Sequence, residues 1–168
     1  MSQALSFILK SSVQQTIGAM ASILKKAEAH GQAAAVEDGV FLSARLYPDM
    51  HPLLKQIQMS NDIALRGSCR LAGVEPASVE DNEQSFADCI ARCQNTLAGV
   101  EALDAAAIDA NEMATLQIPI GEMTMPMEGR FYLSNFLLPN LHFHASTTYG
   151  LLRQQGLSIG KRDFLMPG

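Results

Sequence analysis

The chain has 168 residues, of which 48% are hydrophobic and 17% are charged, and its formal net charge is −5. This length suits a domain that buries roughly two-thirds of the surface of its unfolded chain. The composition excludes a disordered chain, and the negative charge argues against nucleic acid or an anionic membrane as the main partner. We therefore expect one globular domain over residues 1–168.

The N-terminus and the cysteines bear on the cellular compartment. MSQALSFILKSS lacks the basic start and apolar run of a signal peptide, and no stretch reaches the roughly 18 apolar residues of a membrane span. The odd number of cysteines does not suggest a secreted disulfide framework. We expect a cytoplasmic protein. Cys89 and Cys93, four residues apart, are interpreted as small buried hydrophobic residues, with a metal or redox pair as the alternative.

Two long helices are predicted in the first half of the chain. The first begins near Ser2, a candidate N-cap, and ends at Gly31, because apolar residues recur at helical spacing between them. The second begins at Pro48, which suits the first turn of a helix, and Asp49 beside it complements the positive end of the dipole. This second helix is predicted to end at Gly73.

The second half of the chain predicts two further helices and a hairpin. VEPASVEDNEQ is polar and reads as a connection, and helical spacing of apolar residues then runs over residues 86–103. TLQIPIGEMTMPME predicts a small exposed β-hairpin that turns at Gly121 and Glu122. Its methionines suit a dimer contact. The last helix is predicted over residues 129–155, interrupted at Pro139 and closed by Gly156.

The histidines are the first candidates for chemistry. His144 shares a helical face with Leu141 and Thr148, so its ring should point into the protein interior, whereas His142 points away. His51, at the start of the second helix, would approach the same end of the interior. The two rings suggest a divalent metal ion such as zinc or nickel. The alternative is that His144 is a core histidine with a hydrogen-bond partner and His51 lies on the surface.

Several other polar residues are candidates for a ligand pocket. Asn61 and Gln56 lie within the second helix and Asn140 lies in the fourth, where an amide either binds a ligand or bridges helices. Tyr149 lies one turn before Arg153, which suits either a ligand contact or anchoring of the C-terminal tail. The candidates for the ligand pocket are Asp49, Asn61, Asn140, Thr148 and Tyr149.

Three segments carry a resemblance to a known family. RLYPDMHPLLKQIQ, RLAGVEP and LPNLHFHASTTYGLLRQQGLSIGKRDFL resemble uncharacterised domains of the DinB-like superfamily, and the resemblance spans essentially the whole chain. It implies an all-α fold, an up-down-down-up four-helix bundle, with the small hairpin before the last helix. It also implies a homodimer.

The resemblance bears on the metal site as well. Better understood members of the superfamily bind a divalent metal through three histidines and act as thiol-dependent transferases, isomerases or hydrolases. His51 resembles the ligand near the second helix, and His144 resembles the first histidine of the pair in the fourth helix. Thr148 stands where the second histidine of that pair would be.

Two functions therefore follow from the sequence. In the first, the chain is a homodimeric helical-bundle protein whose interior polar residues are structural or bind a small molecule, without an intact three-histidine site. In the second, it is a metal-dependent thiol transferase, isomerase or hydrolase that uses His51 and His144. Neither catalytic residues nor a substrate can be assigned from the sequence.

Overall fold

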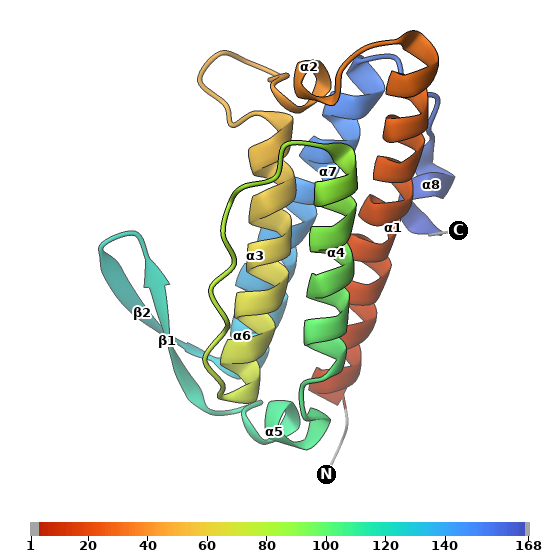
Figure 1. The fold of residues 1–168 in the computed structure, drawn as a ribbon. Helices are drawn as coiled ribbons and strands as arrows, with labels where there is room; N and C mark the ends of the chain where they lie inside the picture. The colour runs from red at the N-terminus through yellow and green to blue at the C-terminus, as the bar shows by residue number, and fades with distance from the viewer. Residues whose placement is uncertain (1–3, 167–168) are drawn as a thin grey trace.

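Four long helices lie side by side in the computed structural model, which describes residues 4–166 (Figure 1). The predicted cap Ser2 lies outside the described residues. Figure 1 shows α3 and α4 running in one direction and α1 and α7 in the other. The expectation of a mostly helical chain with one small hairpin is confirmed. The four helices are α1 (Ala4–Ala34), α3 (Leu53–Ala72), α4 (Phe86–Glu101) and α7 (Leu138–Gln154).

The second helix begins later than predicted. Pro48 and Asp49 lie in the loop before α3, where the Met50 N–H donates to the Tyr47 carbonyl at 3.0 Å. A helix that started at Pro48 would include Pro52, which lacks an N–H and would clash with the carbonyl four residues earlier. Pro52 instead occupies the N-cap of α3 in an extended conformation.

Short helices connect and extend the long ones. They are α2 (Asp38–Leu42), α5 (Ala105–Ala110), α6 (Gly129–Tyr132) and α8 (Lys161–Leu165). A π-helical turn, η1 (Leu133–Leu137), joins α6 to α7. The interruption predicted at Pro139 is therefore present, because the wider turn precedes a residue whose ring crowds the carbonyl four positions back. The fourth helix ends at Gln154, and Gly156 follows with φ +93°.

The predicted hairpin is present and projects from the helices (Figure 1). Strands β1 (Thr115–Ile120) and β2 (Met123–Glu128) pair antiparallel across the two-residue turn of Gly121 and Glu122. Gly121 has φ +59°, which a residue with a side chain rarely adopts. Met123 and Met125 on β2 are 66% and 44% exposed.

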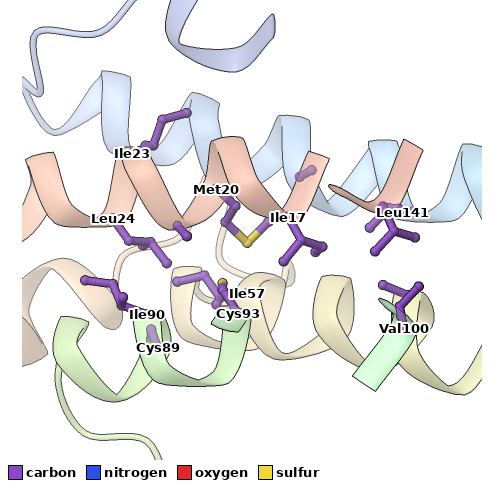
Figure 2. Close-up of a cluster of buried hydrophobic side chains, with 14 of the residues drawn as sticks. Ile17, Met20, Ile23, Leu24, Ile57, Cys89, Ile90, Cys93, Val100 and Leu141 are labelled. Carbon is purple, nitrogen blue, oxygen red and sulfur yellow. The ribbon is translucent and has the colours of Figure 1, made fainter. Parts of the chain in front are cut away.

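The core lies between the four long helices. Figure 2 shows side chains from α1, α3, α4 and α7 meeting there. Phe86 and Leu137 are fully buried, and Gly67 of α3 lies so close to η1 that a Cβ atom would stand 2.4 Å from the Leu137 Cδ1 atom. The labelled core residues of Figure 2 are Ile17, Met20, Ile23, Leu24, Ile57, Cys89, Ile90, Cys93, Val100 and Leu141.

The polar connection between α3 and α4 is the crossover segment, residues 74–84. It runs back alongside the helices from the end of α3 to the start of α4 (Figure 1). Ser85 then caps α4: its hydroxyl accepts from the Asp88 N–H at 3.1 Å, and its own N–H donates to the Asp88 carboxylate at 2.9 Å.

Candidate functional site

The side chain of Gln56 links the two histidines that the sequence singled out. Its amide nitrogen donates to the His51 carbonyl oxygen at 3.2 Å, and its Oε1 lies 2.7 Å from Nδ1 of His144. Gln56 and His144 are 2% and 6% exposed, whereas His51 is exposed. We call these three residues the histidine cluster. The sequence predicted that the His144 ring points inward and left His51 open between the interior and the surface, and it did not pair Gln56 with His144.

The hydrogen bonds of Gln56 determine the protonation of His144. Because the amide nitrogen of Gln56 donates to a carbonyl, its oxygen is the atom that faces the ring, and Nδ1 must donate. The neutral ring then has its lone pair on Nε2. Burial lowers the pKa of His144, and the nearby His51 lowers it further. His144 is therefore neutral at pH 7 and offers one unprotonated nitrogen.

Thr148 supplies a second unused polar atom on the same face of α7. It lies one turn after His144 and is 2% exposed, and its hydroxyl has no hydrogen-bond partner. Most buried polar atoms are paired, so this hydroxyl, one turn from the unprotonated nitrogen of His144, is an exception within the described residues. Asn140, one turn before His144, lines a separate cavity of about 260 Å³ with Arg70 and Tyr132.

The other predicted pocket residues do not join the histidine cluster. Asp49 is exposed in the loop before α3, where the guanidinium of Arg45 donates to the Met50 carbonyl. Asn61 is buried between α3 and α4, where its amide nitrogen contacts the Ile57 carbonyl and Cys93. Tyr149 anchors the C-terminal tail, because its ring packs edge-on against Phe164.

The donor atoms near His144 do not form a three-residue metal site. Among residues 4–166, no group of three His, Cys, Asp or Glu side chains is placed to hold a metal ion. A threonine hydroxyl is a poor ligand for zinc or nickel, which prefer nitrogen and sulfur. The residues present do not fit the three-histidine centre that the resemblance implies.

The two cysteines of α4 are fully buried in the core. Burial raises the pKa of Cys89 to about 12 and that of Cys93 to about 11. Since the thiolate is the reactive form of cysteine, both thiols are unreactive at neutral pH. The structure supports the interpretation of Cys89 and Cys93 as small core residues.

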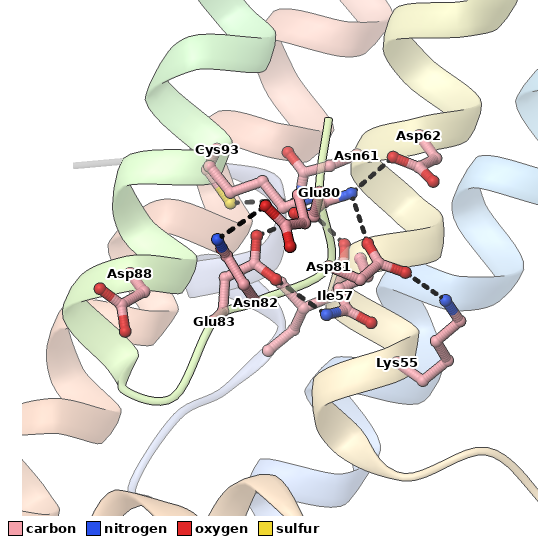
Figure 3. A network of polar contacts seen from close by, with 12 residues as sticks. Lys55, Ile57, Asn61, Asp62, Glu80, Asp81, Asn82, Glu83, Asp88 and Cys93 are labelled. Carbon is pink, nitrogen blue, oxygen red and sulfur yellow. Dashed lines mark hydrogen bonds and ion pairs between the residues drawn. The ribbon is translucent and has the colours of Figure 1, made fainter. Parts of the chain in front are cut away.

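An extended polar network between α3, α4 and the crossover segment was not predicted from the sequence (Figure 3). Arg92 of α4 is only 5% exposed. Its guanidinium nitrogens lie 2.6 Å from a carboxylate oxygen of Glu83, 2.6 Å from one of Asp62 and 3.0 Å from one of Asp81. The available signal of a buried Arg92 was its position, three residues after buried Cys89 and four before buried Thr96. The run of acidic residues in VEDNEQ was a second signal, because it supplies carboxylates that can pair with a buried arginine.

Charges in this network stabilise one another. Burial acts to raise the pKa of Glu83, but hydrogen bonds from Arg92 and Gln58 outweigh it and the pKa is lowered. Burial acts to lower the pKa of Arg92, and its bonds to Glu83 and Asp62 outweigh that and raise it. Glu83 and Arg92 therefore stay ionised at neutral pH, and the ion pairs of Arg92 hold the crossover segment against α3 and α4.

No helix in the described part of the chain has the length and apolar character needed to span a membrane.

Comparison with known proteins places this architecture in a class. The structure matches the crystal structure of a DinB family member from Shewanella denitrificans with a TM-score of 0.88 and 29% sequence identity, over 100% of this chain and 98% of that one. The protein is DinB-like.

The family follows from the sequence match. Residues 8–165 match the family model described as a domain of unknown function, DUF1993, and the chain belongs to that family. No curated protein matches the chain in sequence. The resemblance to an uncharacterised DinB-like family is confirmed.

Proposed function

We propose that this DinB-like protein is a homodimeric helical-bundle domain that binds a small polar molecule at the histidine cluster, without an intact three-histidine metal site. The observation that carries the proposal is the hydrogen bond from Nδ1 of His144 to Gln56 at 2.7 Å. It leaves Nε2 of a neutral ring as an acceptor beside the unpartnered hydroxyl of Thr148. A ligand with a hydroxyl or N–H donor would suit these two atoms.

The overall assembly belongs to the same proposal. The opposite directions of α1 and α7 relative to α3 and α4 in Figure 1 support an up-down-down-up four-helix bundle. The exposed methionines of the hairpin support a dimer contact. We place the protein in the cytoplasm, acting on neither nucleic acid nor a membrane, in keeping with its net charge of −5.

A second function is the metal-dependent thiol transferase, isomerase or hydrolase. One observation favours it: histidines that bind metals usually donate their other ring N–H to an oxygen, as His144 does to Gln56. Water or a carboxylate would have to complete the ligand set of His51 and His144.

Metal analysis separates the two functions. Protein purified without a histidine tag is expected to carry no stoichiometric zinc, nickel, manganese or iron. We also expect no rise in melting temperature when these ions are added, because two histidines bind them weakly. One metal ion per chain, lost in His144→Ala, would instead establish the second function.

Ligand binding can be tested directly by ligand-observed NMR with a set of small hydroxyl-bearing compounds. We expect binders whose signals respond to the wild-type chain and not to the Thr148→Val variant, which removes the hydroxyl at nearly constant volume. His142→Ala, a change at an exposed histidine of the same helix, is the matched control. If every binder behaves alike with wild type and Thr148→Val, the histidine cluster is not the binding site.

A further inference from the structure

A cavity of about 260 Å³ lies where the hairpin stands beside the C-terminal half of α3 (Figure 1). Ile118 and Pro119 of β1 line one side of it, and Arg66 and Arg70 of α3 line another. Arg66 is ten residues after Gln56, which places it about 15 Å further along α3. The cavity is therefore separate from the histidine cluster.

Two arginines line this cavity from the same side of α3. Arg66 and Arg70 are four residues apart, and like charges at this spacing destabilise a helix. Arg66 has no hydrogen bond or ion pair with any residue in the described range 4–166. Asp62 is the carboxylate among the described lining residues, and it is paired with Arg92 at 2.6 Å. The two positive charges are left without a counter-charge of their own, which points to an anion from outside the chain.

Arg70 is held in position by a buried tyrosine. Its guanidinium donates to the hydroxyl of Tyr132 at 3.2 Å, and its Cζ atom lies 5.9 Å from the centroid of the Tyr132 ring. Tyr132 is 3% exposed and so provides a fixed support. A guanidinium has five N–H donors, and Arg70 uses one of them within residues 4–166. A positioned guanidinium with free N–H groups is suited to binding a planar carboxylate through two parallel hydrogen bonds.

Apolar side chains and one amide complete the wall. The amide is that of Asn140 in α7, which makes no hydrogen bond within the described residues. The apolar side chains are those of Ile63, Ile118, Phe136 and Leu137. Such walls favour an anion with an apolar body over a strongly hydrated one such as phosphate. The volume is slightly below the range of about 300 to 1,000 Å³ that is usual for small-molecule sites, so the ligand must be small.

We propose that this cavity binds a small organic carboxylate with an apolar body. The carboxylate accepts hydrogen bonds from the guanidinium groups of Arg66 and Arg70 and from the amide nitrogen of Asn140. The apolar body lies against Ile118 and Phe136. This site is independent of the histidine cluster and of the function proposed there.

Titration of the ¹⁵N-labelled chain with benzoate, followed by NMR at the backbone and arginine Nε–H signals, tests the proposal. We expect saturable shifts with a Kd on the order of 1 mM, given the ligand's small size. Benzamide has the same shape without the negative charge, and no saturable shift is expected for it. Failure of benzoate to bind, or equal binding of benzamide, would overturn the proposal. Tighter binding of inorganic phosphate than of benzoate would also overturn it, because the apolar walls would then take no part.

Three variants locate the binding. Arg66→Gln removes an exposed charge without disturbing the core and is expected to raise the Kd about fivefold. Arg70→Lys keeps the charge but loses the planar pair of donors, and is expected to raise the Kd about threefold or more. Arg162→Gln removes an exposed positive charge outside the cavity wall and should leave the Kd unchanged. Unchanged affinity in both Arg66→Gln and Arg70→Lys would show that the carboxylate binds elsewhere.

Discussion

His144 combines burial with one hydrogen bond and one free nitrogen. Its ring also packs edge-on against Phe143, with centroids 5.1 Å apart. The ring therefore has two roles: it stabilises α7, and it offers a nitrogen to a ligand. A stability measurement isolates the first role, since it needs no ligand.

Replacing His144 by alanine should lower the free energy of unfolding by roughly 2 to 3 kcal/mol, because the change leaves Oε1 of Gln56 unpaired and opens a cavity. His142→Ala, two residues away and exposed, should change it by less than about 0.5 kcal/mol. Urea denaturation of the metal-free protein measures both. Equal effects of the two substitutions would contradict a core role for His144.

The lowered pKa of His144 predicts how stability depends on pH. The unfolded chain binds this proton more tightly than the folded chain, so protonation favours unfolding. The contribution of His144 is fully present above the ordinary histidine pKa of about 6.5 and is lost as the pH falls through the folded value. Urea midpoints should therefore fall between about pH 7.5 and pH 5. His144→Ala should reduce this slope, although the lowered pKa of His142 preserves part of it.

Arg92 is the other residue with a large expected effect. Arg92→Met would leave Glu83, whose side chain is 7% exposed, without its ion pair. Losing one partner of a buried pair costs about 3 to 5 kcal/mol. Adding Glu83→Gln to the variant removes the stranded charge and should restore part of the loss in chemical denaturation. If the double variant is less stable than Arg92→Met alone, the ion pair is not the source of the effect.

The contact between α3 and η1 can be tested with two glycines. Gly67→Ala should lower the free energy of unfolding by about 1 to 3 kcal/mol, because its Cβ would stand 2.4 Å from Leu137 Cδ1. Gly150→Ala in α7 meets no atom within 4 Å and should raise it by roughly 0.5 to 1 kcal/mol. Thermal unfolding compares the two, and a stabilising Gly67→Ala would show that η1 moves aside.

Helical spacing predicted the four long helices because each has one buried face, and the hairpin because a glycine stands at its turn. The predicted start of α3 was too early, because both Pro48 and Pro52 suit the beginning of a helix. Only a start after Pro52 leaves Pro48 in the loop that precedes α3. Within the candidate site, periodicity predicted that His144 faces inward. It could not predict the pairing with Gln56, which depends on how α3 and α7 meet, or the position of the crossover segment.

The exposed methionines of the hairpin are the basis of the predicted dimer. Met123→Ser with Met125→Ser should shift the protein toward monomer, because it removes exposed apolar surface from the proposed contact. Sedimentation velocity at several concentrations measures the shift. Val79→Ser, a change at an exposed apolar residue of the crossover segment, is the control. A wild-type chain that sediments as a monomer, or a dimer that survives the double substitution, would contradict a contact at the hairpin.

The crossover segment also limits how the chain length can vary. Because α3 and α4 run in the same direction, residues 74–84 must retrace α3, whose 20 residues span about 30 Å. The 11 residues of the segment reach at most about 36 to 40 Å when fully extended, so there is almost no slack. Deletions of two or three residues here would pull Arg92 from its carboxylates, whereas insertions would only bow the segment outward. Homologous chains are therefore expected to vary here by gaining residues and not by losing them.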